Sequence, residues 1–216
     1  MEVTFAYSAH RRKGALSGHA AGVKDDPDVH VETRAQWRAW LVEHSEEHDG
    51  VWAVTWRKAS GRPAPSYDSL VEEALCVGWV DSIARAIDDE RTSLRFSRRK
   101  RGSAWARTNK DRVARLSEAG LMLPAGEAAV AAAQADGSWS RLDDVERGVV
   151  PDDLGRALDE NPAARTNFEA FPSSVRRAIL EWIVQAKRAE TRARRVRETA
   201  ELAARGERAN QWRRKY

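Results

Sequence analysis

Two short segments of the sequence bring together side-chain types that can carry out chemistry. Residues 74–82 (ALCVGWVDS) contain the carboxylate of Asp81 together with a hydroxyl and a thiol, and residues 98–105 (RRKRGSAW) begin with four consecutive cations. A carboxylate can act as a general base or orient a substrate, while guanidinium groups bind carboxylates and phosphates. If the residues between the two segments fold back as a hairpin, they form a polar site suited to an anionic ligand.

Eight residues are candidates for this site. Asp81 is the candidate catalytic carboxylate, but it could instead form a structural ion pair with Arg85 or another arginine, because a carboxylate on an apolar strand face needs a partner. The candidate ligand-binding residues supply indole rings, guanidinium groups, a hydroxyl and an amide, and they are Trp79, Arg98, Arg99, Ser103, Trp105, Asn109 and Arg192. Structural roles stay open for the same residues: helix capping for Ser103, cross-bracing for Asn109 and a solvated surface for Arg192.

Other chemistries lack the residues that they need. Cys76 is the only cysteine, so no disulfide can form within the chain, and its place near a helix C-terminus favours a buried, inert thiol. The N-terminal histidines His10, His19 and His30 do not have the spacing of metal ligands. The sequence contains no glycine-rich phosphate loop, zinc signature or nucleophile elbow. We therefore expect neither a metal nor a cofactor.

The apolar pattern predicts the strands that position these candidates. Residues 51–56 predict a strand with Trp52, Val54 and Trp56 on one face. Residues 79–87 predict a second strand, and residues 92–98 predict a strand that returns antiparallel to the second. In a regular strand Ser82 points away from Asp81, so both reach one site only if the strand bulges.

Helical spacing dominates the rest of the chain. Thr33 and Ser66 are placed to cap two helices before the hairpin, and the pattern is helical throughout after Ser103. We therefore predict an α+β fold, in which a small antiparallel sheet with flanking helices is followed by a mostly helical C-terminal half. The predicted parts are a poorly ordered tail, a sheet-containing half, a helical half and a basic tail, at residues 1–32, 33–102, 103–205 and 206–216.

The 216 residues carry a formal net charge of only +4, but the charges are unevenly distributed. Cations concentrate in residues 95–115 and 187–216, whereas acidic residues gather earlier in the chain. A local positive field can steer anions or nucleic acid to a protein, although such runs are also typical of solvated helix faces. No apolar run approaches the ~18 residues of a membrane span, and no signal-peptide pattern is present, so we expect a cytoplasmic protein without membrane insertion.

Several segments together resemble the YdeI/OmpD-associated family, whose members are also described as bacteriocin-protection proteins. The resemblance spans roughly residues 33–205 and is most specific in ALCVGWVDS and in Ser103-Ala104-Trp105. The other matching segments are Trp37 to Leu41, Val51 to Lys58, Phe96 to Asn109, Pro151 to Leu154 and Ala186 to Arg192. The resemblance implies a bacterial cytoplasmic protein linked to envelope stress or to resistance against antimicrobial peptides. It implies no catalytic mechanism and no cofactor.

Three hypotheses for function follow. The first is a stress- or resistance-associated protein that binds an anionic small molecule in a pocket between the sheet and the helical half. The second is an enzyme that uses Asp81 in the same pocket as a general base or orienting carboxylate. The third is a nucleic-acid-binding protein that uses Arg98 to Arg101 and the C-terminal arginines, against which the small net charge weighs. The sequence leaves the oligomeric state open.

Overall fold

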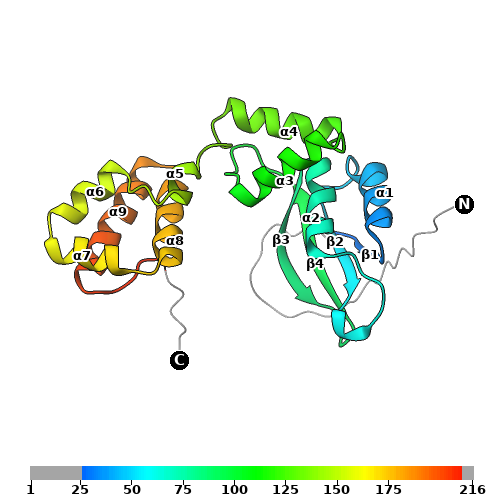
Figure 1. The fold of residues 1–216 in the computed structure, drawn as a ribbon, viewed down its shortest axis with the longest axis horizontal. Coiled ribbons are helices and arrows are strands. Elements are labelled where there is room, and N and C mark those ends of the chain that lie inside the picture. The colour runs from blue at the N-terminus through cyan, green and yellow to red at the C-terminus, as the bar shows by residue number, and fades with distance from the viewer. Residues whose placement is uncertain (1–25, 211–216) are drawn as a thin grey trace, which may run out of the picture. The chain divides into compact units, whose positions relative to one another are not determined.

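The structure, a computed structural model, describes residues 26–210. The chain divides into two compact units, and each is described by itself (Figure 1). Within the described residues, the sheet unit comprises residues 26–103 and 108–132, and the helical unit comprises residues 104–107 and 133–210. The sheet unit thus continues beyond the boundary that we predicted in the sequence, because two of the later helices pack with it.

The sheet unit is built on a four-stranded sheet in the order β1-β2-β4-β3. The predicted hairpin is confirmed, since β3 and β4 pair antiparallel, and β4 also pairs antiparallel with β2. With helices before, between and after these strands, the α+β class is confirmed as well. The strands are β1 (Asp28–His30), β2 (Gly50–Trp56), β3 (Trp79–Ala86) and β4 (Arg91–Arg98).

The edge strand β1 lies within the segment that the sequence assigned to a poorly ordered tail. It pairs parallel with β2, so the sheet is mixed rather than purely antiparallel. Val29 and Val31 at this edge are buried, which gives the strand an apolar anchor. Residues 1–25, with His10 and His19, lie outside the described residues.

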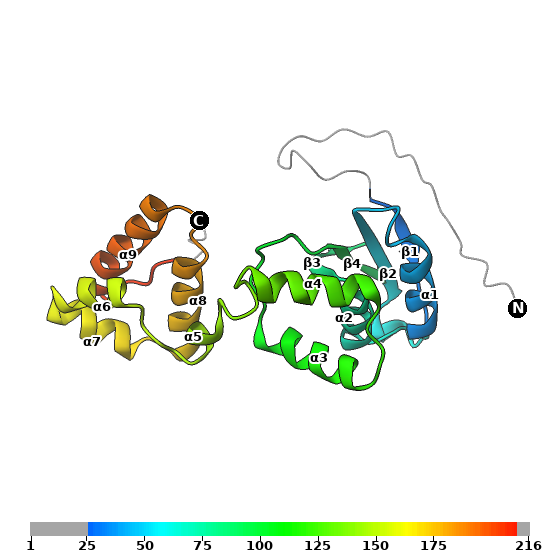
Figure 2. The same cartoon turned by 90° about the horizontal axis from the view of Figure 1, so that it is seen from above.

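Helices α1 and α2 lie on one face of the sheet (Figure 2). The predicted cap of α1 is present as a full capping box. The hydroxyl of Thr33 accepts a hydrogen bond from the backbone N–H of Gln36, and the side-chain oxygen of Gln36 accepts one from the backbone N–H of Thr33. Trp37 of α1 stacks on Trp40 with ring centroids 5.6 Å apart and reaches Phe96 of β4 at 5.2 Å. The helices of this unit are α1 (Arg34–His44), α2 (Tyr67–Cys76), α3 (Arg107–Glu118) and α4 (Pro124–Ala135), with a short 3-10 helix at Lys58–Ser60.

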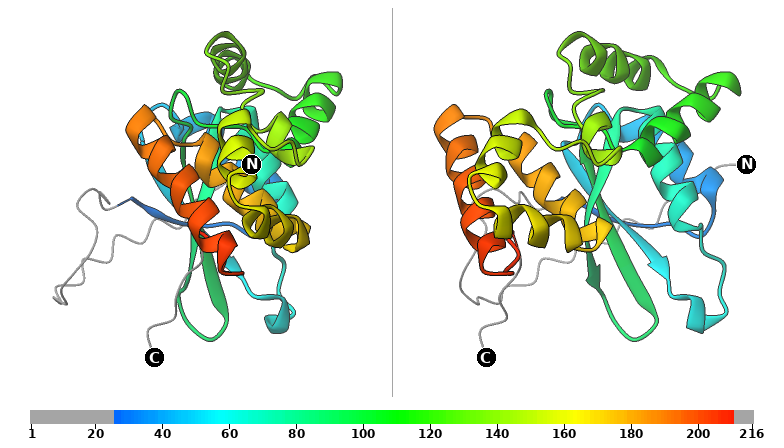
Figure 3. Two further views of the ribbon diagram at one scale, coloured as in Figure 1. Left: turned by 90° about the vertical axis from the view of Figure 1, so that its left-hand side faces the viewer. Right: turned by 60° about the vertical axis from the view of Figure 1, so that its left-hand side comes forward.

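The helical unit consists of short helices around one apolar core (Figure 3). Its helices are α5 (Asp143–Glu146), α6 (Asp152–Asp159), α7 (Pro162–Ala170), α8 (Ser173–Val184) and α9 (Ala189–Ala204). The core residues Leu154, Phe168 and Ile179 come from three of them. Ala209 is also buried in this core, so the chain beyond residue 206 still packs on the unit. No helix within residues 26–210 is long and apolar enough to cross a membrane.

Candidate functional site

The carboxylate of Asp81 is held by a neighbouring phenol. Asp81 lies opposite Phe96 in the register of β3 and β4, so both side chains point to the face that carries α1 and α2. The hydroxyl of Tyr67, at the start of α2, donates a hydrogen bond of 2.8 Å to Oδ2 of Asp81. Burial and this bond raise the pKa of Tyr67, so the phenol stays protonated and continues to donate. The pair joins the first turn of α2 to β3.

Arg99, directly after β4, adds a positive charge to the same cluster. Burial of its guanidinium lowers the pKa of Arg99 to about 10, and the charge of Asp81 acts in the opposite direction. Arg99 therefore remains protonated at neutral pH. Arg85, the partner first considered for Asp81, forms its ion pair with Asp28 instead. The choice between a catalytic and a structural role for Asp81 therefore stays a prediction.

The bulge that Ser82 would need is present. The register of β3 shifts directly after Asp81, and the hydroxyl of Ser82 donates to the backbone carbonyl of Arg95 at 3.3 Å. Ser103 follows a turn in which its backbone N–H donates to the carbonyl of Lys100 at 3.1 Å. Hydrogen bonds to backbone carbonyls therefore fix the positions of both Ser82 and Ser103.

Arg98 and Asn109 are drawn to different partners. The guanidinium of Arg98 donates to the backbone carbonyl of His48 at 3.2 Å. The amide oxygen of Asn109 accepts a bond of 2.9 Å from Arg112, which also pairs with Asp68 at the start of α2. The bond between Arg112 and Asn109 was not predicted from the sequence, although their spacing of three on a helix could have indicated it.

The two candidate tryptophans are core residues. Trp79 is almost fully buried and meets Trp40 edge-to-face, with ring centroids 6.4 Å apart. Trp105 belongs to the helical unit, where its buried ring lies 5.0 Å from that of Trp139. Packing accounts for both indoles.

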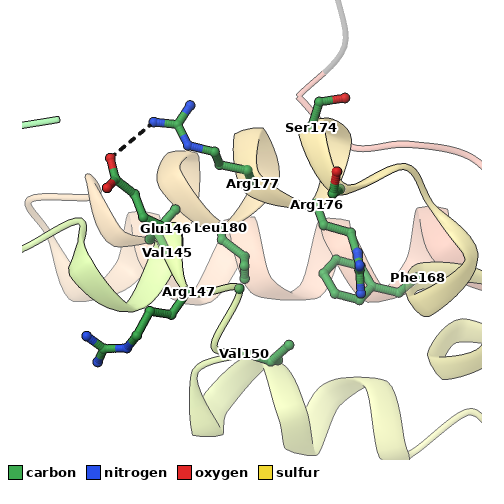
Figure 4. Close-up of a pocket in the computed structure, with 11 residues that line it drawn as sticks. Val145, Glu146, Arg147, Val150, Phe168, Ser174, Arg176, Arg177 and Leu180 are labelled. Carbon is green, nitrogen blue, oxygen red and sulfur yellow. Dashed lines mark hydrogen bonds and ion pairs between the residues drawn. The ribbon is translucent and has the colours of Figure 1, made fainter. Parts of the chain in front are cut away.

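A pocket of about 500 Å³ lies within the helical unit, where α5, α7 and α8 meet (Figure 4). Its apolar lining comes from Val145, Val150, Phe168 and Leu180. Its polar lining comes from Glu146, Arg147, Ser173, Ser174, Arg176 and Arg177. Sequence reasoning did not single out any of these residues, although the run SSVRR at a helix start carried a signal. The combination of an apolar interior with several placed donors is typical of small-molecule sites.

The three arginines of the pocket differ in their partners. Arg147 pairs with Asp144, and Arg177 contacts Glu146 at 3.5 Å and Glu181 at 3.8 Å. The side chain of Arg176 makes no hydrogen bond or ion pair with any residue from 26 to 210. Figure 4 shows Arg176 and Arg177 extending from α8 in different directions. Arg176 therefore carries an uncompensated charge into the pocket wall.

The carboxylate of Glu146, which also lines the pocket, is bound to residues other than Arg176. Glu146, only 12% exposed, accepts the backbone N–H of Arg107 at 2.8 Å in addition to its contact with Arg177. Pro172 precedes α8 and makes no side-chain capping bond, so no capping side chain offsets the positive end of the helix dipole at this wall. An anion at Arg176 would thus meet favourable charge without competing for an existing ion pair.

Arg192 is engaged within the helical unit. Its guanidinium makes two hydrogen bonds to the carboxylate of Asp153, at 2.6 Å and 3.0 Å. This fork joins the start of α9 to the first turn of α6. The bonds also lower the pKa of Asp153, with Arg192 as the largest cause.

Comparison with known families assigns the two parts of the chain differently. Residues 148–206 match the family described as Bacteriocin-protection, YdeI or OmpD-Associated. This segment is similar to that family, and it is called the YdeI/OmpD-associated domain below. Residues 29–129 match a separate family, a domain of unknown function (DUF8412). No match was found among curated proteins or among solved structures.

The predicted resemblance is thereby confirmed over the C-terminal part. The motifs ALCVGWVDS and Ser103-Ala104-Trp105 fall within the span of the other family. In the YdeI/OmpD-associated domain, the two quoted motifs Pro151 to Leu154 and Ala186 to Arg192 are joined by the Asp153–Arg192 fork. These motifs therefore hold the domain together, while most of the pocket lining, from Gly148 onward, lies in the same matched segment.

The fork makes the stability of the YdeI/OmpD-associated domain depend on pH. Because the pKa of Asp153 is lowered on folding, its stabilisation is complete above the unfolded value of about 3.9 and is lost as pH falls through the folded value. We expect Asp153→Asn to lower the free energy of unfolding by about 1 kcal/mol at pH 7, the upper end for partly exposed pairs. The difference from wild type should shrink below about pH 4.

Urea unfolding at several pH values measures this effect. Asp152→Asn is the matched control, because Asp152 is the exposed neighbour in the same helix turn and does not take part in the fork. An Asp153→Asn effect that stays constant from pH 7 to pH 3, or that the control reproduces, would contradict the role of the fork.

Proposed function

We propose that the pocket of the YdeI/OmpD-associated domain binds a small organic anion with an apolar body. The observation that carries the proposal is Arg176, a pocket-lining guanidinium without a partner among residues 26–210. Leaving such a donor unpaired at a half-buried position costs free energy, which an anionic ligand would recover through charge-assisted hydrogen bonds. The ligand class, an anionic small molecule, is the one predicted from the sequence. The proposed site is now the pocket within the helical unit.

The apolar part of the lining supports the second half of the proposal. Val145, Val150, Phe168 and Leu180 offer no hydrogen-bonding side-chain groups, so they suit an apolar body rather than a fully hydrated ion. A volume of about 500 Å³ lies within the usual range for small-molecule pockets. The arginines and serines stand where the charged end of such a molecule would be recognised.

The other hypotheses stay predictions. An enzyme that uses Asp81 would keep its ligand but lose turnover in Asp81→Asn, and the bond from Tyr67 is compatible with an orienting carboxylate. Nucleic-acid binding through Arg98 to Arg101 would weaken steeply with salt. The cytoplasmic location and the role in stress or antimicrobial resistance rest on the family name and on the composition.

Calorimetric titration with small anions tests the proposal. The probes are benzoate, octanoate and phenyl phosphate, with benzyl alcohol as the uncharged reference. We expect at least one anion to bind and Arg176→Gln to weaken it by about ten- to a hundredfold, the value of one charge-assisted contact. Arg156→Gln, an exposed arginine of α6 away from the pocket, is the matched control. Failure of all three anions to bind, or equal loss in both variants, would overturn the proposal.

A further inference from the structure

The donors beside Arg176 narrow the class of ligand. We infer that the pocket recognises a phosphate monoester of an apolar group, an inference that rests on the proposed function. The reasons are the number of donors at the start of α8, the long contacts of Arg177 with its carboxylate partners, and the apolar side chains of Val150, Phe168 and Leu180 in the lining.

One face of α8 gathers the donors. Ser173 lies three and four positions before Arg176 and Arg177, so the three side chains are neighbours on the helix surface. Ser174 lines the same pocket. Two hydroxyls and two guanidiniums from the first turns of α8 therefore line the pocket, with Leu180 one further turn along the helix.

This number of donors exceeds what a carboxylate can use. The planar fork of Arg176 by itself fills two of the roughly four lone-pair sites of a carboxylate. A phosphate monoester presents three terminal oxygens and carries a charge of about −1.5 to −2 at neutral pH. Its third oxygen and additional charge would engage the serine hydroxyls and a second guanidinium together, whereas a carboxylate lacks the acceptor sites for all of them.

Arg177 is placed to supply the second guanidinium. Its contact with Glu146 is 3.5 Å long, at the outer limit of a hydrogen bond, and its contact with Glu181 is 3.8 Å. Glu146 keeps its bond of 2.8 Å from the backbone N–H of Arg107 if Arg177 turns toward a ligand. Sharing Arg177 with a phosphate therefore leaves no carboxylate in the pocket without a donor.

The apolar residues of the lining indicate which group the phosphate is attached to. Val150, Phe168 and Leu180 provide no donor or acceptor for hydroxyl groups. A ribose or other sugar placed against them would lose hydrogen bonds to water without replacement. An aryl or alkyl group would instead be buried favourably.

Comparison of phenyl phosphate with benzoate tests the inference, since both carry one phenyl ring. We expect phenyl phosphate to bind at least tenfold more tightly at pH 7.5. Its affinity should increase as pH rises through about 6, where the second phosphate proton is lost, while that of benzoate stays constant between pH 5.5 and pH 8. The double variant Ser173→Ala/Ser174→Ala should weaken phenyl phosphate at least fivefold and leave benzoate within twofold.

The outcomes separate this inference from the proposed function. If benzoate and phenyl phosphate bind equally and both depend on Arg176, the anion site holds and the phosphate assignment is wrong. If inorganic phosphate binds as tightly as phenyl phosphate, the apolar part of the inference is wrong. If benzoate, phenyl phosphate and octanoate all fail to bind, the proposed function itself fails. Circular dichroism melting of each variant confirms folding, because both serines are exposed at the start of α8.

Discussion

Replacing Gly126 by alanine is expected to lower the free energy of unfolding by about 3 kcal/mol, the upper end of the usual cost of overpacking. A Cβ at this buried position of α4 would lie 2.3 Å from the carbonyl oxygen of Cys76 and 2.8 Å from its carbonyl carbon. Both are backbone atoms at the end of α2, so no side-chain rotation can relieve the contact. Urea unfolding followed by tryptophan fluorescence measures the loss.

Gly155 is the matched control. It also occupies a helix, α6, but the nearest atom to its added Cβ is the end of the Arg165 side chain at 4.0 Å. Gly155→Ala should therefore stabilise the protein by about 0.5–1 kcal/mol through helix propensity alone. Equal effects of the two substitutions would show that the close approach of α4 to α2 does not exist in solution.

Replacing Glu73 by glutamine is expected to cost about 3 kcal/mol, the lower end for breaking a buried ion pair by removing one partner. The carboxylate of Glu73 is 3% exposed and receives Arg34 at 2.5 Å and Arg38 at 2.7 Å. These bonds raise the pKa of both arginines, with the bond from Glu73 as the largest cause. Without the carboxylate, Arg38 would lose its ion pair, and Arg34 would keep only its contact of 3.0 Å with Glu72.

The control for Glu73 is Glu43→Gln on the exposed face of α1. Glu43 is 64% exposed, and its one ion pair within residues 26–210 is with His44 at 3.6 Å, so the substitution should change stability by less than about 0.5 kcal/mol. The comparison uses the same chemical change and the same unfolding assay. A Glu73→Gln protein as stable as the control would contradict the bridging role of Glu73.

The sequence predicted a buried thiol at Cys76, and its burial is confirmed. Its position near the end of a helix indicated an inert thiol, and the structure buries it fully. Burial is the largest cause that raises the pKa of Cys76, with Arg38 acting in the opposite direction. Glu73 and Arg38 were not singled out, because their partners lie more than thirty positions away in the chain.

The pocket marks the limit of sequence reasoning about the site. Motifs with several charged residues, such as residues 98–101, drew attention, yet Arg98 is bound to a backbone carbonyl and Arg99 is buried beside Asp81. Arg176 lines the pocket, and its side chain has no hydrogen bond or ion pair within residues 26–210. Whether a charged side chain is free depends on which distant residues fold against it, and local spacing does not contain that information.

The sequence by itself determined the elements and their order. The capping box at Thr33, the strand at residues 51–56, the hairpin around Asp81 and the helical C-terminal half all follow from local rules of periodicity and capping. The tertiary structure alone decided the parallel strand β1, the glycine contact between α4 and α2, and the partners of each arginine. Secondary structure depends on neighbours a few residues apart, whereas pairing, burial and pocket formation depend on residues that only the folded chain brings together.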